Sequence, residues 1–385
     1  MKEGVTYKRL GEVAPSIKYD GEIVPKNGMF WLLNLDMVEA NTGKVLDKVY
    51  VSKGELDGSI TPFSPDNVLY SKLRPYLNKV VLPDEHGYCT TELVPLYPQK
   101  DQISREYLAY FLRSNTFVGF INEKVAGAKM PRVKMSDFWN YPIPVPSLSF
   151  QEQVVKELDC IAAIVDDKKR QLSELDSLAQ AIFYDAFGDP VSNTKHWGIK
   201  KIGDFSELVA GATPSTKVDE YWNDGTIAWL SSGEVGKRRI YKTESLITQK
   251  GYDSCSTRLV PAHTLLIALA GQGKTRGTVG VAEIPLCTNQ SVCSFLTDET
   301  VDVDFLYYLL KLQYDKLRSI SNSAGGRGGL NLTLLRNFSV IFPPLILQQE
   351  VSRKLKMVEE QKELIQQSIK EFENLLAQRM EFHFA

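Results

Sequence analysis

The feature that most constrains this sequence is an internal repeat whose period is about half the chain. Residues 135–187 and 332–384 align at a shift of 197 positions, and upstream residues align at a shift of 198. The aligned identities are Asn140 with Asn337, Pro146 with Pro343, Leu148 with Leu345, Gln151 with Gln348, Phe187 with Phe384, and Cys89-Thr90 with Cys287-Thr288. The chain is therefore predicted to contain two copies of one architecture, each a globular block followed by a helical block.

The repeat divides the chain into four segments. A length of 385 residues with 43% hydrophobic residues allows more than one apolar core. We predict globular blocks at 1–146 and 188–344, and helical blocks at 147–187 and 345–385. Short apolar runs and frequent turn residues predict an α+β fold with mixed α and β structure in each globular block. The predicted strands are 29–35, 68–70, 79–82, 227–230, 265–269 and 278–282, and the predicted helices are 105–114 and 304–318.

The helical blocks carry apolar residues at alternating steps of three and four, which predicts a coiled-coil seam. Lys168 and Lys362 interrupt it. About 33 helical residues would span roughly 50 Å, and Ser147-Leu-Ser149 before Glu152 predicts a capping box at the first helix. The seam residues are Val154, Leu158, Ile161, Val165, Leu172, Leu175, Ala179 and Ile182 in the first helix, and Val351, Leu355, Val358, Ile365, Ile369, Phe372 and Leu376 in the second.

Two arrangements of these helices are open. Each helix could pack on its own globular block, or the two similar seams could pair with each other. We favour antiparallel pairing, because the turn residues Gly188-Asp189-Pro190 lead directly into the second block. In that case the two blocks lie at opposite ends of the helices and are related by a pseudo-two-fold axis.

Positive charge is concentrated in short stretches although the net charge is only −2. Residues 232–280 contain eight Lys or Arg and three acidic residues, and the stretches 71–79 and 124–134 are also basic. Basic residues mixed with Gly, Ser, Thr and aromatic residues suit contacts to phosphates and base edges. A solvated basic surface is the alternative for any single stretch, but similar placement in both halves favours nucleic acid.

One sequence nearly matches a nucleotide-binding loop. Residues 268–275 (ALAGQGKT) fit the GxxxxGK[ST] pattern except at Ala268. A phosphate-binding loop must lead into a helix, whereas Gly277, Gly280 and Pro285 predict a turn and a strand. We therefore interpret this stretch as a hairpin that carries Gln272, Lys274 and Arg276 towards DNA.

Other classes of protein are not supported. There is no CxxC pair, no HExxH motif, no nucleophile elbow and no long apolar run, so we predict no metal site, no catalytic residue and no membrane span. Five cysteines without pairing fit a reducing cytoplasm.

Several motifs resemble those of a known family. Residues 210–216 (AGATPST), 221–222 (YW) and 227–232 (IAWLSS) resemble the opening of a target recognition domain, and 271–280 followed by 288–290 (TNQ) resembles its central hairpin and next strand. Residues 146–153 and 181–190 resemble the central conserved region, and 348–350 (QQE) match its start in the second half. Essentially the whole chain resembles the specificity subunit of a type I restriction–modification enzyme, although the first block lacks the GxTPS run.

This resemblance implies a function and partners. Two target recognition domains, separated by two long antiparallel coiled-coil helices, would each read one half of a split double-stranded DNA sequence. The helices would dock two modification (methyltransferase) subunits, and restriction (translocase/endonuclease) subunits would join them. This chain would hold no cofactor, whereas S-adenosylmethionine, ATP and Mg would belong to the partner subunits.

The candidate DNA contacts combine this resemblance with the charge pattern. In the first block they are Lys72, Arg74, Tyr76, Lys79, Lys129, Arg132 and Lys134, and in the second they are Ser231, Ser232, Lys237, Arg238, Arg239, Gln272, Lys274, Thr275, Arg276 and Arg327. Two other functions remain open: a stand-alone sequence-specific DNA-binding protein or specificity component of another restriction class, and a coiled-coil scaffold without a DNA role.

Overall fold

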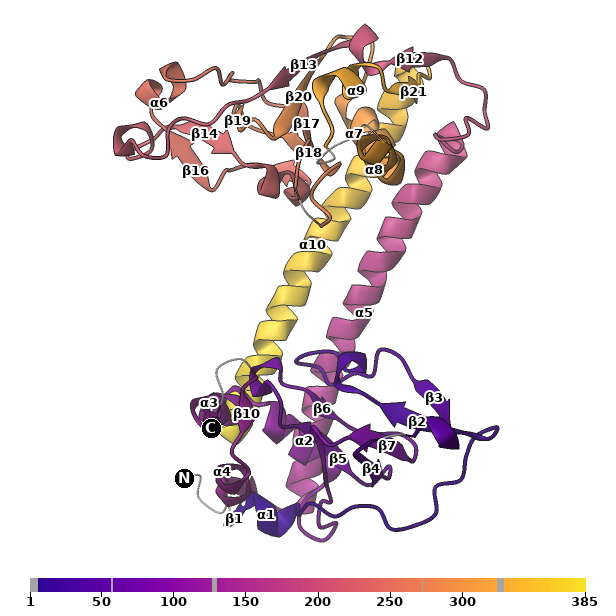
Figure 1. The fold of residues 1–385 in the computed structure, drawn as a ribbon, viewed down its shortest axis with the longest axis vertical. Helices are drawn as coiled ribbons and strands as arrows, with labels where there is room; N and C mark the ends of the chain where they lie inside the picture. The colour runs from indigo at the N-terminus through magenta and orange to yellow at the C-terminus, as the bar shows by residue number, and fades with distance from the viewer. Residues whose placement is uncertain (1–5, 57, 127–129, 272, 324–328) are drawn as a thin grey trace. The chain divides into compact units, whose positions relative to one another are not determined.

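The computed structural model describes residues 6–56, 58–126, 130–271, 273–323 and 329–385. The chain divides into two compact units, a first unit of Met1–Gln171 with Ile365–Ala385 and a second unit of Leu172–Leu364. Each unit therefore combines one globular block with parts of both long helices (Figure 1).

The first unit is built on short sheets covered by helices. Its strand orders are β3-β2-β7-β4 and β6-β5-β8, with separate ribbons β1-β11 and β9-β10. The strands are β1 Thr6–Arg9, β2 Met29–Leu33, β3 Val49–Ser52, β4 Ile60–Phe63, β5 Val68–Ser71, β6 Val80–Val81, β7 Gly87–Thr90, β8 Leu93–Leu96, β9 Val125–Ala126, β10 Arg132–Val133 and β11 Pro142–Val145. The helices are α1 Leu10–Val13, α2 Arg105–Arg113, α3 Asn115–Glu123 and α4 Met135–Asn140, with 3₁₀ turns η1 Leu35–Met37, η2 Lys53–Glu55 and η3 Pro75–Leu77.

The second unit has larger sheets of the same kind. Its strand orders are β13-β20-β17-β18-β15 and β16-β14-β19, with the ribbon β12-β21. The strands are β12 Ile199–Lys201, β13 Ser206–Ala210, β14 Ile227–Leu230, β15 Arg239–Ile240, β16 Ser245–Ile247, β17 Thr264–Ala268, β18 Val279–Ala282, β19 Cys287–Thr288, β20 Val292–Thr297 and β21 Ser339–Ile341. The helices are α6 Gln249–Asp253, α7 Val303–Leu312, α8 Tyr314–Ser323 and α9 Leu332–Arg336, with 3₁₀ turns η4 Ile202–Asp204, η5 Asp219–Tyr221 and η6 Ser232–Lys237.

The repeat is visible in equivalent elements. The antiparallel ribbons β1-β11 and β12-β21 join the start and the end of each globular block, directly before a long helix. Strands β2, β5, β6, β14, β17 and β18 occupy the six predicted strand positions, so the α+β prediction is confirmed.

The prediction of a single helix over residues 304–318 was wrong. It divides into α7 and α8 because Gln313 leaves helical geometry (φ −97°, ψ 18°).

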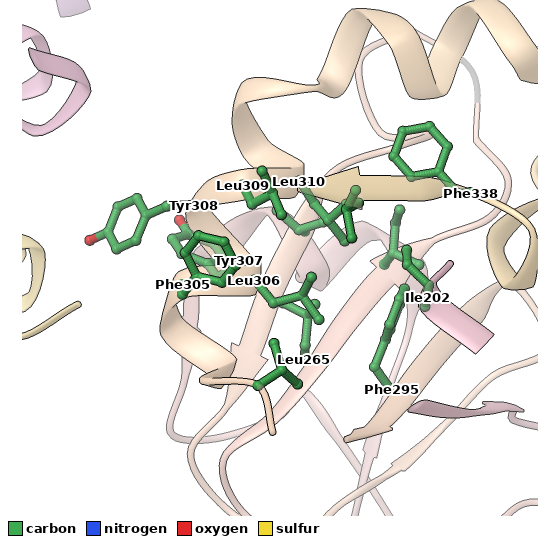
Figure 2. Close-up of a cluster of buried hydrophobic side chains, with 14 of the residues drawn as sticks. Ile202, Leu265, Phe295, Phe305, Leu306, Tyr307, Tyr308, Leu309, Leu310 and Phe338 are labelled. Carbon is green, nitrogen blue, oxygen red and sulfur yellow. The ribbon is translucent and has the colours of Figure 1, made fainter. Parts of the chain in front are cut away.

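Each unit has its own apolar core, and the long helices α5 (Leu148–Phe187) and α10 (Leu345–Phe384) contribute to both. In the second unit, side chains of β17, β20 and α7 surround Phe305 and Leu306 (Figure 2). Phe183 and Phe187 of α5 complete this core. In the first unit, Phe384 of α10 packs edge-on against Tyr107 of α2.

The long helices run antiparallel in the first unit. Glu157 pairs with Arg379, whose Nη2 lies 3.1 Å from Oε2, and Lys169 pairs with Glu373 at 2.8 Å. The later residue of α5 thus meets the earlier residue of α10. Of the seam residues, Val154, Leu158, Ile161, Val165, Ala179, Val351, Leu355, Val358 and Ile369 are buried, and Leu172, Leu175, Ile182, Ile365, Phe372 and Leu376 are half-buried.

The two lysines that interrupt the seam have specific partners. The Lys168 ammonium lies 5.6 Å from the centre of the Phe372 ring. Lys362 is only 1% exposed, and its Nζ lies 2.6 Å from Asp176 Oδ1 and 3.1 Å from Glu359 Oε1. Since a buried ammonium requires compensating charge, these carboxylates explain why a lysine is tolerated in the seam.

Each long helix has 40 residues, about 60 Å at 1.5 Å per residue, which exceeds the predicted length. The predicted capping box forms only in part, because Ser147 caps α5 at Leu148 but Glu152 does not return to the cap. Ser147 Oγ accepts from Phe150 N at 3.4 Å, and Glu152 pairs with Lys156 instead.

A buried glutamine anchors the start of each long helix. Gln151 Oε1 accepts from Ser104 N at 2.9 Å, and its Nε2 donates to Gln102 O and Pro146 O at 2.8 and 2.9 Å. Gln348 does the same in the second unit. It accepts from Asp302 N at 2.9 Å and donates to Pro343 O at 2.7 Å. Because Ser104 and Asp302 are the N-caps of α2 and α7, these amides tie each long helix to its globular block.

All five cysteines are free thiols. In the ranges that the structure describes, no helix combines the length and the apolar character that a bilayer span requires.

Candidate nucleic-acid interface

The candidate residues concentrate on two equivalent hairpins. In the first unit β5 pairs antiparallel with β6, with Leu69 opposite Val81, and in the second unit β17 pairs with β18, with Ile267 opposite Val279. The same 198-residue shift relates both pairs, so the hairpin loops 71–79 and 269–277 correspond in length and register. We call them the first loop and the second loop.

The first loop presents two exposed candidate side chains. Arg74 is exposed at φ 50°, and Tyr76, in the 3₁₀ turn η3, is 52% exposed. Lys72 is half-buried. The Lys79 ammonium is bound within the protein. Its Nζ donates to Leu35 O at 2.6 Å and so stabilises the 3₁₀ turn η1. Arg74 and Tyr76 are therefore the groups of this loop best placed to meet a ligand.

The segment before α4 lies against the first loop. Val133 N donates to Lys72 O at 2.9 Å, and Arg74 N donates to Pro131 O at 2.8 Å. Arg132 is exposed, but its Nη2 pairs with Glu92 Oε1 at 2.9 Å, and this hydrogen bond lowers the pKa of the Glu92 carboxyl. Lys134 is exposed, with Asp137 Oδ2 3.9 Å from its ammonium, and Lys129 lies outside the described residues.

The second loop is glycine-rich and leads into a strand. Gly271, Gly273 and Gly277 all have positive φ, at 137°, 66° and 86°. The chain continues into β18, as predicted, so the helix that a phosphate-binding loop needs is replaced by a strand. Lys274 is exposed, whereas Thr275 and Arg276 are half-buried. Gln272 and Arg327 lie outside the described residues.

The candidates in 231–237 belong to a network around the buried carboxyl of Glu234. Ser231 N donates to Glu234 Oε1 at 3.1 Å, and Lys237 Nζ lies 3.1 Å from Oε2. Burial raises the pKa of Glu234, but hydrogen bonds from Glu244 N, Ser231 and Lys237 outweigh it and keep the pKa low. Lys237 also pairs with Glu244 at 2.8 Å. Ser232 is half-buried at the start of η6.

The structure corrects one predicted contact, Arg239, and gives the candidate Arg238 an acidic partner. The Arg239 side chain is 10% exposed, and its guanidinium nitrogens lie 2.8 Å from Glu283 and 2.6 Å from Asp304. Burial would lower its pKa, but these two carboxylates raise it above the ordinary value. Arg239 is therefore a core ion pair and not an accessible DNA contact. Arg238, at φ 67°, directs its guanidinium to Glu359 of α10 at 3.4 Å.

Sequence reasoning missed the residues that support the loops. Arg318 and Tyr314 of α8 hydrogen-bond to carbonyls of the second loop, and Arg113 O accepts from Asn78 Nδ2 of the first loop at 3.0 Å. These groups lie far from the loops in sequence, and nothing in the charge pattern distinguishes their residues from solvated ones. Over the described residues, no cluster of three or more His, Cys, Asp or Glu side chains is placed to hold a metal ion.

Comparison with known proteins matches this architecture to one family. The family model described as "Type I restriction modification DNA specificity domain" matches residues 3–176 and 194–374, one copy in each half. The MjaIX specificity subunit of Methanocaldococcus jannaschii is 37% identical over 120 residues, covering 30% of this chain and 27% of that protein. The EcoR124I/EcoR124II specificity subunit of Escherichia coli is 24% identical over 219 residues, covering 54% and 53%. The chain thus aligns with about half or less of the length of these relatives.

Solved structures share the fold over the whole chain. The type I restriction–modification S subunit from M. genitalium has a TM-score of 0.62 at 13% identity, covering 100% of this chain and 98% of that one. A chain from a structure on complex assembly and conformational transition of the type I R-M system has the same TM-score at 18% identity, covering 99% and 97%.

Proposed function

Because this chain belongs to the type I restriction–modification DNA specificity family, we propose that it reads a split DNA sequence as the specificity subunit of such an enzyme. The observation that carries the proposal is the pair of hairpin loops. They share register and length, but Arg74, Tyr76 and Asn78 of the first loop correspond to Gln272, Lys274 and Arg276 of the second. Different side chains at equivalent positions would read two different half-sites.

The remaining parts of the proposal concern partners and chemistry. We assign double-stranded DNA, two modification subunits and restriction subunits as partners, in the cytoplasm. The chain itself would be non-catalytic, and S-adenosylmethionine, ATP and Mg would be held by the partner subunits. Exposed Arg74, Lys134 and Lys274 would contribute salt-dependent contacts to phosphates or base edges.

The test is to express the chain with its neighbouring modification subunit in a host that lacks adenine methylation, and to map adenine methylation across the genome. A split motif with a methylated adenine in each half supports the proposal and identifies both half-sites. A soluble complex that adds no methylation refutes it. DNA binding by the chain alone would then separate a stand-alone DNA-binding protein from a scaffold.

A further inference from the structure

Two side chains of α8 hold the second loop through its main chain. Arg318 Nη1 donates to Gly273 O at 2.8 Å and to Arg276 O at 3.2 Å. The Tyr314 hydroxyl donates to Lys274 O at 2.8 Å and accepts from Arg318 Nη1 at 3.0 Å. Three loop carbonyls therefore converge on one guanidinium–phenol pair, which we call the α8 clamp.

The second loop needs this support because its glycines allow many main-chain conformations. Three glycines at positive φ give the unfolded loop many alternative conformations. Local hydrogen bonds close its base, from Gly277 N to Ala268 O at 2.9 Å and from Thr278 N to Thr275 O at 3.0 Å. Among the described residues, the contacts that hold the tip at Gly273 and Lys274 come from the α8 clamp.

The first loop reaches the same register by different means. Pro75 begins the 3₁₀ turn η3, and Leu77 N and Asn78 N close local turns to Arg74 O and Pro75 O at 2.9 and 2.8 Å. A proline, these local hydrogen bonds and the bonds to Pro131 O and Arg113 O limit its alternatives without a guanidinium–phenol clamp. The α8 clamp is thus specific to the second loop, and its loss should leave the first loop unchanged.

We propose that Arg318 and Tyr314 are positioning residues that fix the second loop in its DNA-reading conformation without touching DNA. The inference rests on the proposed function for its DNA partner. Arg318 Nη1 is directed at the loop carbonyls, and its guanidinium lies 5.5 Å from the centre of the Tyr314 ring. Both side chains lie beneath the loop, about 3.6 Å from where a Cβ on Gly277 would be. Preorganising a loop improves binding because less conformational entropy is lost in the complex.

The experiment compares Tyr314→Phe and Arg318→Ala with the control Lys316→Ala, a cation of the same helix that lies over the Phe338 ring. Each full chain is purified with its modification subunit, and binding is measured to the mapped target and to duplexes with one half-site altered. Both clamp variants should lose roughly tenfold in affinity for the target, with discrimination lost in one half-site only. The slope of log affinity against log salt should stay unchanged, since no phosphate contact is removed. Lys316→Ala should bind the target as wild type does.

Results that would overturn the clamp differ from results that would overturn the proposed function. If Arg318→Ala lowers the salt slope by about one while Tyr314→Phe has no effect, Arg318 is a direct phosphate contact and the proposal is wrong. Unchanged discrimination in both clamp variants also overturns it. If the wild-type complex recognises no split motif, the proposed function fails. Hydrogen exchange then still tests the clamp, because amides of 273–278 must exchange faster in Tyr314→Phe, which keeps the ring and its packing. Unchanged exchange would overturn the clamp as well.

Discussion

Replacing Gln151 or Gln348 by alanine should destabilise the corresponding unit without altering the hairpin loops. Both amides are 0% exposed. Gln151 makes three hydrogen bonds of 2.8–2.9 Å to main-chain groups, and Gln348 makes two, of 2.9 and 2.7 Å. Alanine removes these bonds and leaves main-chain partners in partly buried positions without them.

The magnitude follows from the number of bonds. Each lost bond costs about 1 kcal/mol net, and a main-chain group left buried without a partner costs about 1–3 kcal/mol. Gln151→Ala should therefore lower the free energy of unfolding of the first unit by about 3–4 kcal/mol. Gln348→Ala should lower that of the second unit by about 2–3 kcal/mol. The larger loss in the first unit is the specific expectation.

The assay is urea denaturation combined with hydrogen exchange. The matched controls are Gln153→Ala and Gln349→Ala, which truncate exposed glutamines near the starts of the same helices. The amides of Ser104 and Asp302 should exchange faster in the corresponding variant, because each loses its acceptor. If Gln151→Ala and Gln153→Ala have the same stability within about 0.5 kcal/mol, the buried amide does not anchor the helix and the reasoning is refuted.

Three other predictions concern buried charge, buried amides and pH. Lys362→Met should lower the free energy of unfolding by about 3 kcal/mol, because it leaves the 10% exposed Glu359 carboxylate without its buried partner. Adding Glu359→Gln should recover most of that loss in denaturation experiments. Gln313→Leu should raise the free energy of unfolding by about 1 kcal/mol. The Gln313 side chain is 1% exposed, and its amide has no hydrogen-bond partner among the described residues. A lower melting temperature of the variant would contradict this prediction. The hydrogen bond from Arg379 lowers the pKa of Glu157, so its contribution is present above the unfolded value of about 4.3 and is lost as pH falls through the folded pKa. Glu157→Gln should therefore lose less stability between pH 5 and pH 3 than wild type, as measured by urea midpoints.

Much of the fold could be predicted because it depends on local pattern and on the repeat. The runs that became β14 and β17 combine β-branched and apolar residues between turns, and the heptad steps mark two long helices. The division at Gln313 could not be predicted, because this residue continues the helical pattern and departs from it only in the folded chain. The Gln151 anchor at the start of α5 could not be predicted, because it depends on partners at Gln102 and Ser104 that only the folded chain brings together.

The candidate interface was predictable in location but not in detail. The sequence shows that residues 232–280 are basic. It does not distinguish a Lys or Arg exposed on the surface from one buried in an ion pair. Arg239 illustrates this, because its neutralising partner Glu283 lies 44 residues away and Asp304 lies further still. The roles of Arg318 and Tyr314 could not be predicted either. Their partners are main-chain carbonyl oxygens, which every residue has, so the sequence does not mark them.

The two halves of the chain build the same architecture from different residues. Comparing them shows which contacts occur in both halves and which differ between the two hairpin loops. Gln151 and Gln348 make equivalent hydrogen bonds in both halves, so the junction of helix and globular block needs an amide at that place. The hairpin loops keep register and length, yet one is stabilised by a proline turn and the other by the α8 clamp. A loop whose support comes from within its own unit can change its side chains without disturbing the equivalent loop. This independence is what a protein that reads two different half-sites requires.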